Sequence, residues 1–513
     1  MVIDGEHYPP VVAAALAGLR RRYEVVGGLF AGGREKLRGG TAAAPRLAAE
    51  LGLPRLDVVD PLGGKVADVL DAVRAALAET GAEALVDLSD EPVIGYRERF
   101  LLMSAALAEG ARYVAADTEL WPQEFAGVTA MPALGVIGTG KRVGKTAVSG
   151  WLARRLDAHL RAAAGAGSGG GSSSGAGGVI VVAMGRGGPP KPELIAGGDG
   201  LGPVELLAAS RAGHHAASDC YEDAVLAGVP AVGCRRCGGG LAGMPFDDNV
   251  RAALPLVETS GAAMAVFEGS GSVVPPVACD AALCVAGASQ PAGYVTGYLG
   301  TYRLLLSDVL VLTQCEPPFA DTADVRALAA AARAVAPGLE VVPVVFRPRP
   351  AQPVRGRRVA FFTTAPEGAV PRLAQALAED HGAEVVLVCT DLADRARLAP
   401  AVARAAREAD VFLTEIKAAA VDVVAEGAAA AGRELVFCDN EPVALEGDLG
   451  AAVDRLAALA AERFAARPAQ AADAPLEQER RPAGTGARME PGAAGAVDRQ
   501  PAPRRWGVIE HGR

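Results

Sequence analysis

The chain has 513 residues, half of them apolar, and a formal net charge of −10. The length is enough for about three domains, and the intermixed acidic and basic residues argue against a dedicated nucleic-acid binder, which usually carries a basic face. The absence of a long apolar run or a secretory signal, together with eight scattered cysteines, predicts a cytoplasmic protein with free thiols and no membrane partner.

Residues 1–130 alternate predicted strands and helices, which is typical of a parallel sheet covered by helices. The expected strands are residues 23–30, 56–59, 84–88 and 113–116, with a helix over 65–79. Polar clusters at 32–36 and 87–92 follow strands, and open α/β sheets bind ligands outside the carboxyl ends of their strands. We therefore expect an N-terminal Rossmann-like α/β domain.

A glycine-rich segment, residues 138–146 (GTGKRVGKT), follows the apolar run 132–137 and precedes a helical pattern. This order lets the backbone N–H groups of the loop and the helix N-terminus bind a polyphosphate. The segment departs from the usual G-x-x-x-x-G-K-[ST] pattern, because Thr139 stands where the first glycine is expected and Gly138 precedes it.

The same segment supplies the predicted contacts with a nucleotide. Lys145 is expected to reach the β- and γ-phosphates, and the Thr146 hydroxyl to bind Mg²⁺. The phosphate cradle is predicted to comprise Gly138, Thr139, Gly140, Val143 and Gly144, with Lys141 and Arg142 as further candidates for contacting the transferring group. A glycine-rich turn that binds nothing is the alternative.

Residues 131–345 are predicted to form this central nucleotide-binding domain, interrupted by a flexible Gly/Ser insertion at 165–178. Further strands are expected at 179–184, 263–267, 281–286 and 309–313. Glu268 ends one of them, where a carboxylate can hold Mg²⁺ beside the γ-phosphate. Thr313 ends another and is a candidate contact of the base, and the missing N/T-K-x-D pattern favours ATP over GTP.

Two basic segments of this domain suit an anionic substrate. Arg186 and Lys191 follow the strand 179–184 on a glycine-rich loop, although a solvated basic loop is the alternative. Arg235 and Arg236 are expected in a second glycine-rich loop with Gly238 and Gly239, where two guanidiniums would receive a multiply charged phosphate. Cys234 and Cys237 flank these arginines, but zinc would need a second pair of ligands.

Residues 214–223 leave two alternatives open. Asp219 and Glu222 have the spacing of a helix capping box, or else His214 or Asp219 lies near Mg²⁺ or a phosphate. We keep Asp219 as a candidate metal ligand.

The C-terminal part begins after residues 346–353, a predicted Pro-rich linker. A third Rossmann-like α/β unit is expected over residues 355–466, with strands at 358–362, 384–389, 411–414 and 434–437. Residues 467–513 lack hydrophobic periodicity and are predicted to be a disordered tail.

Together these segments resemble the cyclic 2,3-diphosphoglycerate synthetase family, whose P-loop is of the dethiobiotin synthetase type. The resemblance lies in residues 3–10 (IDGEHYPP), 87–97 (DLSDEPVIGYR), 138–146, 217–223 (ASDCYED), 235–236, 415–422 (EIKAAAVD) and 439–440. It covers most of the chain up to about residue 465, without the insertion and the tail. It implies a central P-loop NTPase domain with a mostly parallel sheet, flanked by two Rossmann-like units.

The resemblance also implies an ATP-dependent ligase that closes a phosphoanhydride ring on 2,3-bisphosphoglycerate. One substrate phosphate would attack the γ-phosphorus of ATP, and the neighbouring phosphate would then close the ring and expel inorganic phosphate. The residues expected to act on the transferring group are Lys145, Lys141, Arg142 and Arg186. Those expected to hold the small anionic substrate are Arg235, Arg236, Gly238, Gly239 and Lys191, and Arg186 is also expected at the substrate phosphates beside the two arginines. The expected Mg²⁺ ligands are Thr146, Glu268 and Asp219.

Two other functions remain open from the sequence: a phosphoglycerate-type kinase that stops before ring closure, and a P-loop switch that acts on a partner protein. The sequence also leaves open whether the chain forms a homodimer.

Overall fold

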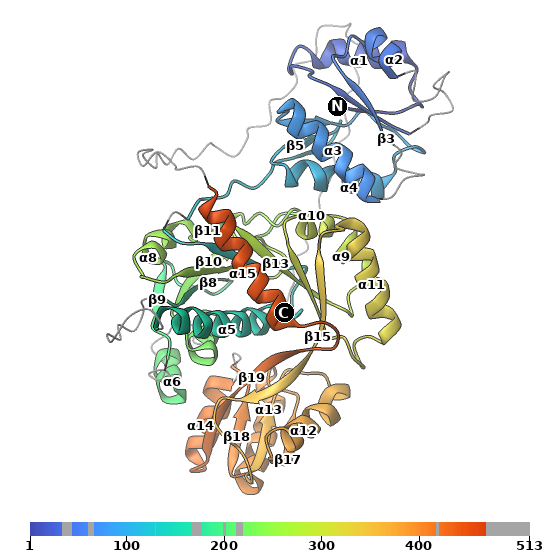
Figure 1. The fold of residues 1–513 in the computed structure, drawn as a ribbon. Coiled ribbons are helices and arrows are strands. Elements are labelled where there is room, and N and C mark those ends of the chain that lie inside the picture. The colour runs from blue at the N-terminus through green and yellow to red at the C-terminus, as the bar shows by residue number, and fades with distance from the viewer. Residues whose placement is uncertain are drawn as a thin grey trace, which may run out of the picture. The chain divides into compact units, whose positions relative to one another are not determined.

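The computed structural model describes residues 1–32, 44–59, 66–128, 130–165, 177–198, 202–211, 219–416 and 420–467. Residues 1–466 form one compact unit, in which helices flank a large, mostly parallel sheet (Figure 1). The predicted α/β fold class is therefore confirmed. Most of the Gly/Ser insertion, His214 and the tail beyond residue 467 lie outside the described residues. Every described helix is too short or too polar to cross a bilayer.

The N-terminal strands follow the order β3-β2-β1-β4-β5-β6, because a parallel bridge between Val2 and Asp87 joins two three-stranded sheets. The strands are β1 (Val2–Ile3), β2 (Gly28–Ala31), β3 (Leu56–Val59), β4 (Ala84–Val86), β5 (Arg112–Val114) and β6 (Glu119–Leu120). The helices are α1 (Pro9–Leu19), α2 (Ala44–Leu51), α3 (Val66–Thr80) and α4 (Tyr96–Ala108). The strand expected at 23–30 starts only at Gly28, since its neighbours β1 and β3 offer no earlier partners.

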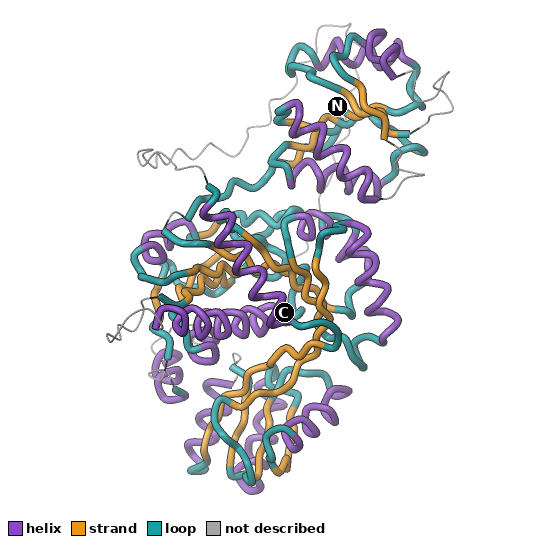
Figure 2. Tube along the Cα trace, viewed as in Figure 1, coloured by secondary structure: helices purple, strands orange, loops and turns teal. Residues whose placement is uncertain are grey.

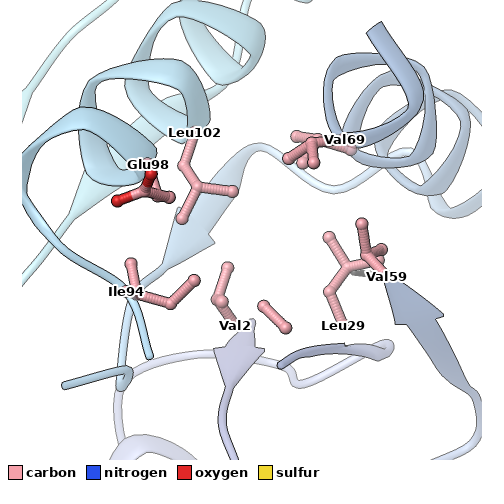
Figure 3. Close-up of a pocket in the computed structure, with 9 residues that line it drawn as sticks. Val2, Leu29, Val59, Val69, Ile94, Glu98 and Leu102 are labelled. Atoms are coloured by element: carbon pink, nitrogen blue, oxygen red, sulfur yellow. The ribbon is translucent and has the colours of Figure 1, made fainter. Parts of the chain in front are cut away.

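A cavity in this N-terminal part belongs to its hydrophobic core (Figure 3). Eight of its nine lining residues are aliphatic, and the ninth is Glu98. The Glu98 carboxylate accepts a hydrogen bond from the Gly95 N–H at 3.1 Å and so caps α4. The charged side chain of this lining thus has a structural role at the start of α4.

The central sheet carries the parallel strands in the order β10-β8-β12-β7-β13-β14-β15. Their bounds are β7 (Ala133–Gly138), β8 (Val179–Gly185), β10 (Ala231–Cys237), β12 (Met264–Glu268), β13 (Ala281–Gly287), β14 (Val309–Thr313) and β15 (Glu340–Pro350), and β9 (Glu193–Ile195) and β11 (Asp247–Asp248) pair antiparallel with β10. Most residues of these strands are buried, as expected for a parallel sheet with both faces covered.

The helices of the central part are α5 (Lys145–Gly165), α6 (Pro203–Arg211), α7 (Asp219–Glu222), α8 (Leu254–Glu258), α9 (Ala292–Thr296), α10 (Gly300–Leu305) and α11 (Thr322–Val335). A π-helical turn, Asp223–Ala227, continues α7, and a 3-10 turn, Arg251–Ala253, precedes α8. Because α5 starts directly after the loop that leaves β7, the central strand of the sheet points at the N-terminus of this helix.

The segment 346–353 is not the linker expected from its prolines. Up to Pro350 it belongs to β15, whose first half pairs with β14 and whose second half pairs antiparallel with β19 (Glu434–Ala444) (Figure 2). This second half of β15 pairs with a strand on one side only. Prolines are tolerated there because the N–H groups that they lack are not needed for pairing between strands. The central and C-terminal strands thus form one sheet.

The C-terminal part contains β16 (Arg358–Phe362), β17 (Glu384–Cys389) and β18 (Val411–Thr414), which with β19 form a parallel set in the order β17-β16-β18-β19. Its helices are α12 (Val370–Glu379), α13 (Arg395–Glu408) and α14 (Ala425–Ala430), with short turns at Glu367–Ala369 and Ala420–Val424.

The last helix, α15 (Leu449–Ala465), leaves this C-terminal unit and packs on the central sheet beside α5 (Figure 1). Its buried residues, among them Val453 and Leu456, belong to the same core as β7 and β13. Arg155 of α5 forms a paired hydrogen bond with Asp454 of α15 at 3.0 and 2.7 Å. The core of the central domain therefore includes a helix that we expected, from the sequence, to belong to the C-terminal α/β unit.

Candidate nucleotide and phosphate site

The loop between β7 and α5 has the glycine requirements of a tight anion cradle. A Cβ atom on Gly138 would lie 2.6 Å from the Gly271 carbonyl oxygen, so only glycine fits there. Gly144 has a φ of 80°, in the region that favours glycine. Thr139 is accommodated because its hydroxyl donates to Gln290 Oε1 at 2.5 Å. The shifted position of the first glycine thus has a steric explanation.

Lys145, at the start of α5, and Glu268, at the end of β12, form a buried ion pair next to this loop. Lys145 Nζ lies 3.5 Å from Glu268 Oε2, and both side chains are buried, with 8% and 1% of their surface exposed. Asp223, on the π-helical turn, is also buried and lies beside α5. Within the described residues, Lys145 Nζ and all four carboxylate oxygens of Glu268 and Asp223 lack a hydrogen-bond partner. Buried polar atoms normally have such partners, so this cluster is suited to a ligand.

This cluster holds more carboxyl groups than ammonium groups. Burial alone would lower the pKa of Lys145, but Glu268, Asp219 and Asp223 outweigh it and raise that pKa. Burial raises the pKa of Glu268, against the opposing effect of Lys145. Burial and the neighbouring carboxylates raise the pKa of Asp223 well above its ordinary value. An added cation would favour the ionised forms of these carboxyl groups and so lower their pKa values.

Asp219, the candidate from the sequence, begins α7 and lies close enough to act on Lys145. Asp223 was missed by the sequence analysis. The spacing from Asp219 could have indicated it, because residues four apart in a helix lie on the same face.

These residues fit Mg²⁺ only together with oxygens from elsewhere. Within the described residues, no three His, Cys, Asp or Glu side chains are grouped as a metal site. The unpartnered oxygens of Glu268 and the half-buried Thr146, in the first turn of α5, are hard oxygen donors of the kind that Mg²⁺ prefers. Phosphate oxygens of a nucleotide would have to supply the remaining ligands.

Two arginines converge on Gly271 next to the loop. A Cβ atom on Gly271 would lie 3.3 Å from Arg186 Nη2 and 3.9 Å from Arg236 Nη2. Arg236 donates to the Gly238 carbonyl at 2.7 Å and to the Ser270 carbonyl at 2.9 Å. Burial and the charge of Arg186 lower the pKa of Arg236. Because neither guanidinium forms an ion pair with a described carboxylate, the pair is suited to an anion.

The expected placement of Arg235 and Arg236 side by side in a glycine-rich loop is wrong. Both residues belong to β10, which extends to Cys237, instead of to a glycine-rich loop. Successive side chains of a strand point to opposite faces, and accordingly Arg236 is buried while Arg235 is exposed. Gly238, with a φ of 66°, and Gly239 follow the strand. The partner of Arg236 at the site is Arg186, which lies at the end of the neighbouring strand β8.

The remaining candidates lie around this centre. Lys141 and Arg142 are exposed at the tip of the loop, and Lys191 is exposed on the segment before β9. Thr313 is fully buried, and its hydroxyl donates to the Val143 carbonyl at 2.7 Å. Thr313 therefore supports the loop from below, and its buried hydroxyl is not free to contact a base.

The carboxyl edge of the central sheet thus carries Arg186 directly after β8, Arg236 on β10, Glu268 at the end of β12 and the glycine-rich loop after β7. A strand, a phosphate-binding loop and a helix with this lysine define a P-loop nucleotide-binding protein. Family models agree: the cyclic 2,3-diphosphoglycerate synthetase N-terminal, P-loop and C-terminal domains match residues 1–121, 133–345 and 350–441. The chain belongs to the cyclic 2,3-diphosphoglycerate synthetase family.

Relatives with this name cover most of the chain. The protein from Rubrobacter xylanophilus is 49% identical over 86% of this chain and 93% of its own length. Those from Thermococcus gammatolerans and Methanothermus fervidus are 40% and 36% identical, over 89% and 88% of this chain and 96% and 94% of their own. Among solved structures, the hydrogenase maturation factor HypB of Archaeoglobus fulgidus aligns with 42% of this chain, over 82% of its own length, at 11% identity. The TM-score of this alignment is 0.25.

Proposed function

We propose that this protein uses ATP to convert 2,3-bisphosphoglycerate into cyclic 2,3-diphosphoglycerate, with release of ADP and phosphate. The observation that supports this most directly is the place of Gly271. Its carbonyl lies against Gly138 of the P-loop, and a Cβ atom on it would lie 3.3 Å from Arg186 Nη2 and 3.9 Å from Arg236 Nη2. A triphosphate in the loop and a phosphorylated substrate on the arginines would therefore be neighbours.

The chemistry proceeds in two displacements at phosphorus. A phosphate oxygen of the substrate attacks the γ-phosphorus of ATP, and the bond to the ADP oxygen breaks. The second phosphate then attacks the substrate phosphorus that carries the transferred group, and inorganic phosphate leaves as the ring closes. Both steps bring anions together, so the protein must mainly neutralise charge and align the groups.

The residues supply that neutralisation from two sides. We assign Lys145 to the γ-phosphate, and Arg186 and Arg236 to the substrate phosphates. Lys141 and Arg142 extend from the tip of the loop and are assigned to the transferring group. Lys191, Arg235 and the glycines 238 and 239 remain assigned to the outer part of the substrate site.

Thr146 and Glu268 would hold Mg²⁺, with Asp219 nearby. When bound there, Mg²⁺ would neutralise charge on the nucleotide phosphates. We also propose a cytoplasmic setting, which is supported by the free thiols of Cys234, Cys237, Cys284, Cys315, Cys389 and Cys438.

The test is ³¹P NMR of a mixture of the protein, ATP, Mg²⁺ and 2,3-bisphosphoglycerate. We expect a cyclic phosphoanhydride signal with equimolar ADP and phosphate, and none of them when 2,3-bisphosphoglycerate is omitted. A stable acyclic product would identify a kinase, and ATP hydrolysis that is indifferent to 2,3-bisphosphoglycerate would identify a switch. Either result would overturn the proposal.

A further inference from the structure

Two residues other than glycine adopt left-handed backbone conformations and face each other at the P-loop. Arg142, at the tip of the loop, has a φ of 64°, and Gln314, directly after β14, has a φ of 60°. Residues with side chains seldom adopt such angles, and where they do the surrounding contacts hold them there, often at functional sites.

The side chain of Gln314 connects the two positions. Its amide nitrogen donates to the Arg142 carbonyl at 3.1 Å, and its amide oxygen accepts from the Ser289 hydroxyl at 3.0 Å. At the other end of the loop, Gln290 Oε1 accepts from the Thr139 hydroxyl and from the Gly287 N–H at 3.0 Å. Both ends of the loop are thus held by amide side chains from the segments that follow β13 and β14.

These bonds determine where the loop N–H groups point. In a planar trans peptide the C=O and N–H bonds point in opposite directions. Because the Arg142 carbonyl is bound by Gln314, the Val143 N–H points away from Gln314. Because the Val143 carbonyl is bound by Thr313, the Gly144 N–H points away from β14. Within the described residues, neither N–H donates to another protein atom.

We propose that Gln314 is a positioning residue for the nucleotide: it fixes the Arg142–Val143 peptide so that consecutive N–H groups remain available to phosphate oxygens. Successive backbone N–H groups in such conformations form anion-binding concavities. The proposal rests on the nucleotide use proposed above, and it adds a residue outside the loop that controls the shape of the loop.

The test separates the amide from the backbone conformation. Gln314→Gly keeps the left-handed φ without strain and removes only the side chain, whereas Gln314→Ala removes the amide and adds strain. We expect both variants to bind ADP about three- to tenfold more weakly, because each lacks the hydrogen bond to the Arg142 carbonyl. The thermal midpoint of Gln314→Gly should not fall, and its KM for ATP should rise while its KM for 2,3-bisphosphoglycerate stays unchanged.

Gln375→Ala is the matched control, because Gln375 is exposed on α12 and its amide donates to Glu379 of the same helix turn at 2.9 Å. It should bind ADP as the wild type does. If Gln314→Gly binds ADP like the wild type, the amide has no positioning role and the proposal is wrong. ADP binding is measured without the second substrate, so a failure to form the ring product would count against the proposed reaction and not against the role of Gln314.

Discussion

At the scale of single residues, the buried Lys145–Glu268 pair has two consequences. The geometry places the ammonium at the start of α5, where a phosphate would be contacted. The same burial makes each partner dependent on the other, because an unpaired buried charge is more costly than the pair is stabilising. Function and stability can therefore be separated by changing the partners one at a time.

Lys145→Ala is expected to lower ring formation at least about 100-fold, in line with the loss of a group that stabilises transition-state charge. It should also lower the free energy of unfolding by about 3–5 kcal/mol, because Glu268 is left buried and unpaired. Adding Glu268→Gln should restore much of the stability without restoring turnover. Denaturant unfolding and phosphate release measure the two effects. Recovery of turnover in the double variant would contradict the assignment of Lys145.

The two arginines of the substrate side give a second prediction. Arg186→Ala should raise the KM for 2,3-bisphosphoglycerate about 10- to 100-fold, because it removes a charge-assisted hydrogen bond to a substrate phosphate. The KM for ATP should change little. Arg235→Ala is the comparison, because Arg235 is exposed on the other face of β10 and should have the smaller effect. Steady-state kinetics in both substrates distinguish the two. Equal effects would contradict the placement of Arg186 at the substrate phosphates and of Arg235 in the outer part of the site.

At the scale of elements, alternation along β10 decides which of its side chains meet. Cys234 and Arg236 are buried, whereas Arg235 and Cys237 are exposed. The C-x-x-C spacing therefore puts one thiol inside the sheet and the other in solvent. The alternation also brings Arg236 toward the end of β12, next to Arg186 from β8.

Thiol reactivity tests this alternation. Burial raises the pKa of Cys234 to about 12, so its reactive thiolate form is scarce at pH 8 and becomes common only as the pH rises toward that value. Cys237 should therefore react first with a thiol reagent at pH 8. Cys237→Ser should remove the fast phase, and Cys234→Ser should leave it. Fast labelling of Cys234 in the folded protein would show that the strand register is different.

At the scale of the whole molecule, the central and C-terminal parts, which the sequence predicted as separate domains, are joined by a shared sheet and by α15. β15 and β19 carry one sheet from the central strands into the C-terminal ones. α15 returns to cover the central sheet, with Val453 and Leu456 almost completely buried. The central domain consequently depends on residues more than 100 positions beyond its last strand.

Leu456→Ala should lower the free energy of unfolding by about 2–5 kcal/mol, because it leaves a cavity against the central sheet. The loss should be visible in the fluorescence of Trp151, which lies in α5 and packs against the same core. Leu445→Ala is the control, since Leu445 is 51% exposed and should have little effect. If α15 belonged only to the C-terminal unit, the Trp151 transition would stay unchanged in Leu456→Ala.

The sequence by itself determined the α/β class, the strand–loop–helix around Lys145, the carboxylate at the end of β12 and the family. These follow from patterns within a few residues: apolar runs, glycines where the backbone needs them, and the residue that ends a strand. Only the tertiary structure decided that Arg235 lies on the opposite face of β10 from Arg236, that Asp223 joins Lys145, that Gln314 holds the loop, and that α15 completes the central core. Those contacts depend on strand order and on which face a side chain occupies, and residues far apart in the sequence come together only when the sheet has formed.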